Sequence, residues 1–180
     1  MPIDTIPMTG PASVSLVALA IGVPVLVLAA LHDVAARTIP DWTSIVLAAL
    51  GLALRFAAGQ LPMALILAVT VFAACAFCCL RGWLGGGDVK LLAACTLLVP
   101  PTGVFGLLCD TMLAGGVVAL VYLVGRTRGR RHAAKIAPRP TGLLARLWRC
   151  ERHRFGRGGP LPYGSAIAAG TMVVLFAPVS

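Results

Sequence analysis

The sequence predicts an all-α membrane protein: a bundle of six transmembrane helices in which a short fourth helix follows a glycine-rich break. Apolar residues make up 59% of the 180 residues, charged residues only 12%, and the mean hydropathy is +0.94. A soluble domain averages about 45–50% apolar and about 25% charged residues. The apolar residues also fall in long runs, as membrane helices require. At this length we expect one membrane domain over residues 1–180.

Five apolar runs have the length of a membrane helix, which is about 17–25 residues. The sixth run, Val89–Val99, ends at Pro100 and has only eleven residues. At about 1.5 Å per residue it covers little more than half of a hydrocarbon core about 30 Å thick. We therefore expect the preceding glycines to form a non-helical turn below the membrane surface, with a re-entrant segment as the alternative. The five full spans are expected at Val14–Leu31, Trp42–Ala58, Leu61–Leu80, Gly103–Gly125 and Tyr163–Val179.

The distribution of basic residues predicts the orientation of the chain in the membrane. The net charge is +9, and eleven of the fifteen basic residues lie between Arg126 and Arg157. With six spans, fourteen of the fifteen fall on one side and only Arg55 on the other. The positive-inside rule then predicts a basic cytoplasmic loop at 126–160 in the inner membrane, with both termini outside the cytoplasm. Such a loop suits anionic lipids. We expect no nucleic-acid partner, because no aromatic-basic platform accompanies the charge.

One stretch of this loop, Thr141–Cys150, has an apolar stripe that fits an interfacial helix, or it is an irregular solvated loop.

Two aspartates are the chemical candidates. Asp33 follows the first span and Asp88 precedes the fourth, so both should lie at the cytoplasmic face. Carboxylates at membrane depth are costly and suggest function. Two of them close together would share a proton, so that one can activate water while the other protonates a scissile carbonyl. Spacing alone leaves proton relay and helix capping open. Asp110, inside the fifth span, is expected to be structural, either protonated or paired with Arg55.

Three motifs carry a family resemblance. The stretch from His32 to Asp41, with Asp33 followed by Ile39-Pro40, resembles the first motif of the type IV prepilin peptidases, where Asn is usual in place of Asp41. The run from Gly85 to Leu91 resembles the family's second motif, Gly-x-Gly-Asp-x-Lys-Leu. A late Pro-x-Gly element opens the final helix. The motif residues are Pro40, Asp41, Gly85, Gly86, Gly87, Lys90, Pro162, Tyr163 and Gly164.

The resemblance implies an aspartic endopeptidase that needs no metal or cofactor. It would cut the short basic leader from pilin-like precursors, with Asp33 and Asp88 as the catalytic pair and Gly85–Lys90 as the active-site loop. Longer members carry paired CxxC motifs linked to N-methylation. This chain has no such region, so we expect peptidase activity without methyltransferase activity, as in the compact enzymes of Flp-type pili. A relative of the archaeal preflagellin enzymes is the less favoured alternative.

Several roles stay open at this stage. Asp41 is expected to start the second span, since Asp and Asn both cap helices. Lys90 could favour one ionised acid, bind a substrate carboxylate or lipid phosphate, or extend to the interface. An alternative function is a small proton- or cation-coupled transporter that uses the membrane aspartates. A third is a redox pair at Cys75 and Cys78, although such cysteines also serve as apolar filler.

Overall fold

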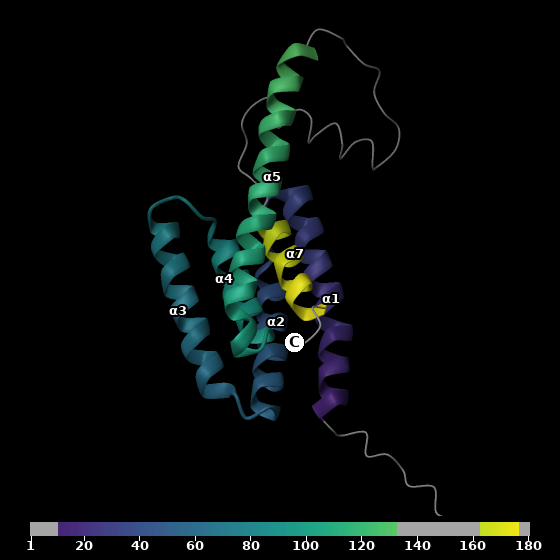
Figure 1. The fold of residues 1–180 in the computed structure, drawn as a ribbon, viewed down its shortest axis with the longest axis vertical. Helices are drawn as coiled ribbons and strands as arrows, with labels where there is room; N and C mark the ends of the chain where they lie inside the picture. The colour runs from purple at the N-terminus through teal and green to yellow at the C-terminus, as the bar shows by residue number, and fades with distance from the viewer. Residues whose placement is uncertain (1–10, 133–162, 177–180) are drawn as a thin grey trace, which may run out of the picture.

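The computed structural model describes residues 11–132 and 163–176, and within these ranges every regular element is helical. The chain reverses direction at each successive helix, so the end of α1 and the starts of α4 and α7 lie at the same end of the bundle (Figure 1). This confirms the predicted all-α class. The elements are α1 (Pro11–Ala36), α2 (Asp41–Ala57), α3 (Leu61–Leu80), α4 (Gly86–Leu98), the 3-10 turn η1 (Pro101–Gly103), α5 (Val104–His132) and α7 (Tyr163–Phe176).

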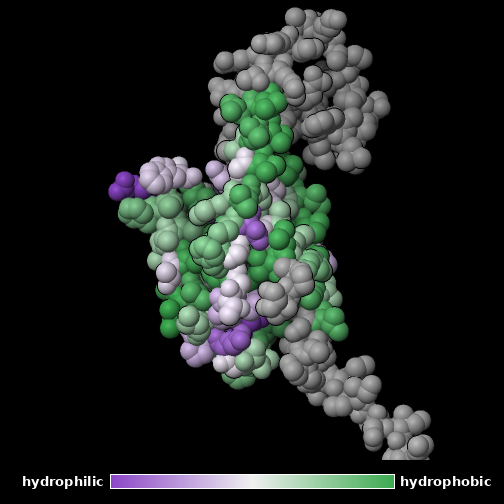
Figure 2. All heavy atoms as spheres, viewed as in Figure 1, coloured by the Kyte–Doolittle hydropathy of each residue, from purple (hydrophilic) through white to green (hydrophobic). Residues whose placement is uncertain are grey.

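Three segments are long and apolar enough to cross a membrane: Leu19–Ala36, Leu61–Leu80 and Pro101–Val124. The other helices are shorter, with 17 residues in α2, 13 in α4 and 14 in α7. Large apolar side chains remain exposed along the flank of the bundle, which Figure 2 shows as a mostly green surface. Such a surface is typical of contact with lipid rather than water. The six-span arrangement itself stays a prediction.

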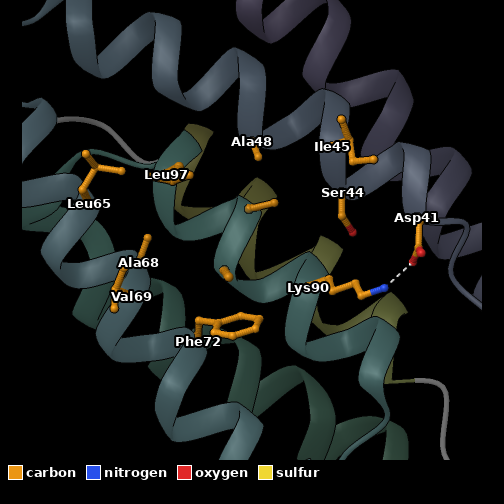
Figure 3. A pocket seen from close by; sticks show the side chains of 12 residues that line it. Asp41, Ser44, Ile45, Ala48, Leu65, Ala68, Val69, Phe72, Lys90 and Leu97 are labelled. Carbon is orange, nitrogen blue, oxygen red and sulfur yellow. Dashed lines mark hydrogen bonds and ion pairs between the residues drawn. The ribbon is translucent and has the colours of Figure 1, made fainter.

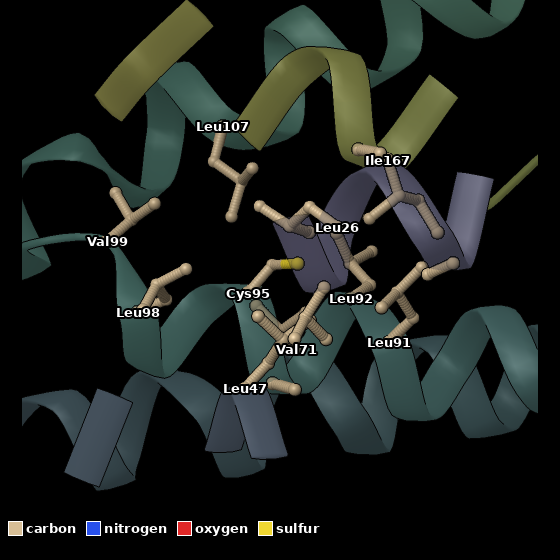
Figure 4. Packing of buried hydrophobic residues seen from close by; sticks show 14 of the residues in the cluster. Leu26, Leu47, Val71, Leu91, Leu92, Cys95, Leu98, Val99, Leu107 and Ile167 are labelled. Carbon is tan, nitrogen blue, oxygen red and sulfur yellow. The ribbon is translucent and has the colours of Figure 1, made fainter. Parts of the chain in front are cut away.

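The short helix α4 lies inside the bundle. It packs against α2, α3 and α7, and most of its residues are buried. Leu91 and Cys95 on α4 meet Leu26, Leu47 and Leu107 from three other helices in one core (Figure 4). Because protein covers most of α4, its backbone ends need not reach both membrane surfaces. This explains how eleven to thirteen residues suffice at this position.

Close backbone contact holds α2 on α4. A Cβ added to Gly51 would lie 2.6 Å from the backbone carbon of Leu97. Small residues at helix interfaces allow such an approach, and packing is the main source of helix association in lipid.

Some expected boundaries were wrong. The helix α1 continues to Ala36, so Asp33 lies in its last turn rather than after it. Gly86 and Gly87 are helical, because α4 starts at Gly86 with Gly85 as its N-cap; the non-helical break is at residues 81–85. Helix α5 runs to His132, so residues 126–132 are helical rather than loop. In each case the helical hydrogen bonding extends beyond the apolar run, past its last residue in α1 and α5 and ahead of its first residue in α4. The segment Thr141–Cys150 lies outside the described residues.

Candidate active site

Asp33 is buried against the start of another helix. Its side chain is only 6% exposed, and its Oδ2 accepts a hydrogen bond from the backbone N–H of Ser165 at 3.2 Å. Ser165 is the third residue of α7, where unpaired N–H groups and the helix dipole favour negative charge. Gly164 makes this approach possible, since a Cβ there would lie 2.9 Å from the same oxygen. The α7 N-terminus is thus shaped to hold a carboxylate.

Asp88 is held by the first turn of its own helix. It is the third residue of α4, and the backbone N–H of the N-cap Gly85 hydrogen-bonds its carboxylate. This is the carboxylate half of a capping box. A Cβ on Gly85 would lie 2.9 Å from Oδ2 of Asp88, so a side chain at this position would displace that oxygen.

The two carboxyl groups interact. Asp88 lies outside the three segments long enough to span a membrane. The pKa of Asp88 is raised from 3.8 to about 6: burial is the largest cause, the negative charge of Asp33 adds to the rise, and a hydrogen bond from the Gly85 N–H opposes it. A like charge has this effect only at short range. The structure therefore brings together the two acids that the sequence singled out.

Ile39 links the two acidic positions. A Cβ on Gly87 would lie 3.2 Å from Cβ of Ile39, and one on Gly164 would lie 2.8 Å from its Cδ1. The side chain of Ile39 therefore packs between the first turns of α4 and α7. This gives the Ile-Pro element a spacing role next to both aspartates.

The connection from α1 to α2 is fixed by polar contacts. Arg37 adopts a left-handed conformation, with φ of 60°, and its side chain binds the hydroxyl and ring face of Tyr122 on α5. Nδ1 of His32 donates to the Thr38 carbonyl at 2.7 Å. The Thr43 hydroxyl donates to the Pro40 carbonyl, also at 2.7 Å. A non-glycine residue at positive φ persists only where its surroundings hold it. These contacts fix the loop that carries Ile39.

Asp41 and Lys90 pair with each other. Nζ of Lys90 lies 2.9 Å from Oδ1 of Asp41, and both side chains are more than half exposed. The helix α2 does begin at Asp41, but Pro40 is the N-cap and Asp41 makes no capping bond. Asp41 is the first helical residue, one position past the cap, and its carboxylate forms the exposed ion pair instead. Lys90 thus has a partner other than Asp88.

Asp110 and Arg55 do not form a pair, which was one of the two alternatives for Asp110. Arg55 donates to the side chain of Gln60 at 2.9 Å and to the Leu98 carbonyl at 3.5 Å. The second bond links the C-terminal ends of α2 and α4. Asp110 is half-buried on α5.

Some site residues were missing from the sequence prediction. Ser165 contributes through its backbone, so its residue type gives no signal. Ile39 was visible only as part of the Ile-Pro element. Among the described residues, no three His, Cys, Asp or Glu side chains gather as a metal site.

These features agree with a family comparison. The family model described as the type IV leader peptidase family matches residues 20–120, which include both aspartates. The chain belongs to this family. No curated protein and no solved structure matched the chain. Membership of the family supports a peptidase, and the long apolar helices indicate a membrane protein.

Proposed function

We propose that this protein is a membrane aspartic endopeptidase that removes the leader peptide of prepilin-like precursors. One observation carries the proposal: two aspartates, Asp33 buried at the end of α1 and Asp88 half-buried at the start of α4, interact electrostatically at one end of the bundle. The family membership supplies the reaction class, a leader peptidase. A pair of interacting carboxyl groups supplies the acid and the base that peptide hydrolysis needs.

The environments of the two acids suggest different roles. Asp33 faces the N-terminus of α7, which stabilises its charged form, so it is the base that takes a proton from water. Asp88, with its pKa near 6, holds the shared proton and donates it to the carbonyl oxygen of the scissile bond. The resulting hydroxide adds to the carbonyl carbon. Collapse of this intermediate breaks the C–N bond: the amine leaves with the proton taken up by Asp33, and one hydroxyl proton of the intermediate returns to Asp88 as the carboxylic acid forms. Each cycle consumes one water and restores the pair.

The distribution of charge supports the orientation, and the family supports the substrate class. The positive-inside rule puts this end of the bundle at the cytoplasmic face of the inner membrane, with both termini outside. A precursor would present its basic leader there and leave its apolar segment in the membrane. The basic segment 126–160 would contact anionic lipid.

Cleavage of a pilin-like precursor by the reconstituted protein tests the proposal. Asp33→Asn and Asp88→Asn should each lower kcat by at least about 10³-fold, because each removes one partner of the pair. The matched control is Asp110→Asn, an equally conservative change in a half-buried helical aspartate away from the pair. It should cleave within about twofold of wild type. Cleavage that survives both changes, or an equal loss in all three variants, would refute the assignment.

A further inference from the structure

A groove opens on the side of the bundle between α2 and α3, with α4 as its floor (Figure 3). Its volume is about 460 Å³. Each helix contributes four residues at positions i, i+3, i+4 and i+7, starting from Asp41, Leu65 and Lys90. This spacing is one face of a helix. The helices α2 and α3 touch each other little, whereas both pack closely on α4. The groove therefore has the form of a slot for one further helix.

The two ends of the groove differ in polarity. One end holds the ion pair of Asp41 and Lys90. Ser44 lies beside it, 6% exposed, and Figure 3 shows its hydroxyl directed toward Lys90. Within residues 11–132 and 163–176, the Ser44 oxygen has no hydrogen-bond partner. A buried hydroxyl without a partner costs about 1–3 kcal/mol, so the site favours an occupant with a polar group at this depth.

The rest of the groove is apolar and partly lined by small residues. Ala48, Ala68, Ala93 and Ala94 stand on its three walls. Small side chains let another helix backbone come close. From Lys90 to Leu97 the groove follows α4 for about 10 Å, or two helical turns.

The polar end lies next to the candidate active site. Lys90 is two residues beyond Asp88, and Asp41 is two residues beyond Ile39, which packs against Gly87. The polar end of the groove therefore adjoins the candidate catalytic pair, and its own two charges, Asp41 and Lys90, are paired with each other.

We propose that this groove seats the apolar helix that follows the cleaved bond of the precursor. The inference rests on the proposed function and names its substrate-binding surface. A precursor whose apolar helix begins just after the cleaved bond would place that helix in the apolar slot and the bond beside Asp33 and Asp88. Lys90, the one cation among the lining residues, is already paired with Asp41, so the groove offers little to the phosphate of a lipid headgroup. The groove then fixes how far the scissile bond stands from Asp88.

Two tryptophan variants on α3 test the groove. Val69 lines it and is 64% exposed, whereas Ile66, one turn earlier and 62% exposed, does not line it. Val69→Trp should raise KM for the full precursor roughly tenfold, and Ile66→Trp should leave it unchanged. Neither should affect a short peptide that spans the cleavage site and ends before the apolar helix. Equal effects of both variants on the KM for the precursor would overturn the proposal that the groove seats its apolar helix. Failure of the wild type to cleave either substrate would instead overturn the proposed function.

Photo-crosslinking gives a second test that needs no turnover. A photoreactive residue is placed at position 69 or 66 of the Asp88→Asn variant in vesicles that contain the precursor. We expect an adduct with the apolar helix of the precursor from position 69 and none from position 66. Adducts with lipid alone from position 69, or equal adducts from both positions, would overturn the proposal.

Discussion

The contact between Gly164 and Asp33 makes one substitution especially informative. In Gly164→Ala, the new methyl group would lie 2.9 Å from Oδ2 of Asp33 and 2.8 Å from Cδ1 of Ile39. Ordinary van der Waals contact begins at 3.4 Å, so the carboxylate would have to retreat by about 0.5 Å. Its hydrogen bond to the Ser165 N–H is already 3.2 Å long, and this shift would break it. The methyl group thus acts directly on the base.

The expected loss follows from that displacement. A misplacement of reacting groups by about 1 Å can cost about 10²-fold in rate. The carboxylate displacement of about 0.5 Å in Gly164→Ala should therefore lower kcat about tenfold or more. Overpacking of this kind costs about 1–3 kcal/mol of stability. The assay is precursor cleavage by the reconstituted protein, with thermal unfolding measured on the same samples.

Two further variants separate the clash from the general effect of alanine. Gly116→Ala makes the same change in α5, where a Cβ meets nothing within 4 Å, and should keep full activity. The second variant adds Ile39→Val to Gly164→Ala and so removes the Cδ1 atom that the new methyl group meets. This double variant should regain only part of the lost activity, because the contact between the methyl group and Asp33 remains. If Gly164→Ala and Gly116→Ala turn over the precursor equally, the proposed seat of Asp33 at the α7 N-terminus is wrong.

Two other predictions concern Asp88. Gly87→Ala should lower kcat several-fold, because its Cβ would lie only 3.2 Å from Cβ of Ile39. Gly86→Ala is the control, since a Cβ there meets open space, and it should remain active. Equal activities of the two variants would contradict the spacing role of Ile39. Cleavage should also depend on pH. The proton on Asp88 is lost as pH rises through about 6, so kcat/KM should fall about tenfold per pH unit above it. A flat profile from pH 6 to 8 would contradict Asp88 as the proton donor.

The sequence predicted the parts of the site that depend on local pattern. The α3 prediction matched Leu61–Leu80 at both ends, because Pro62 favours a helix start and Arg81 ends an unbroken apolar run. The meeting of Asp33 and Asp88 followed from counting reversals of direction between them, which requires only that each apolar run form one helix.

The contacts that refine the site could not be predicted in this way. Asp33 binds a backbone N–H that lies 132 residues away, and Lys90 pairs with an aspartate 49 residues away. Such pairings depend on how far each helix extends and turns, and α1 alone ends five residues beyond the expected Leu31. The assignment of Asp41 as a cap was wrong for the same reason. A capping propensity is local, but the lysine that competes for the carboxylate comes from another helix.

One glycine in each of the two motifs lies against the carboxylate that it accompanies. Gly85 and Gly164 belong to different motifs, yet a Cβ on either would lie 2.9 Å from a carboxylate oxygen, of Asp88 in one case and Asp33 in the other. Each acid therefore lies at the N-terminus of a helix whose glycine leaves room for it. One helix is its own and the other is distant in sequence, so the two acids differ in environment although they are the same residue type. That difference is what a pair needs if one member is to give a proton while the other takes one.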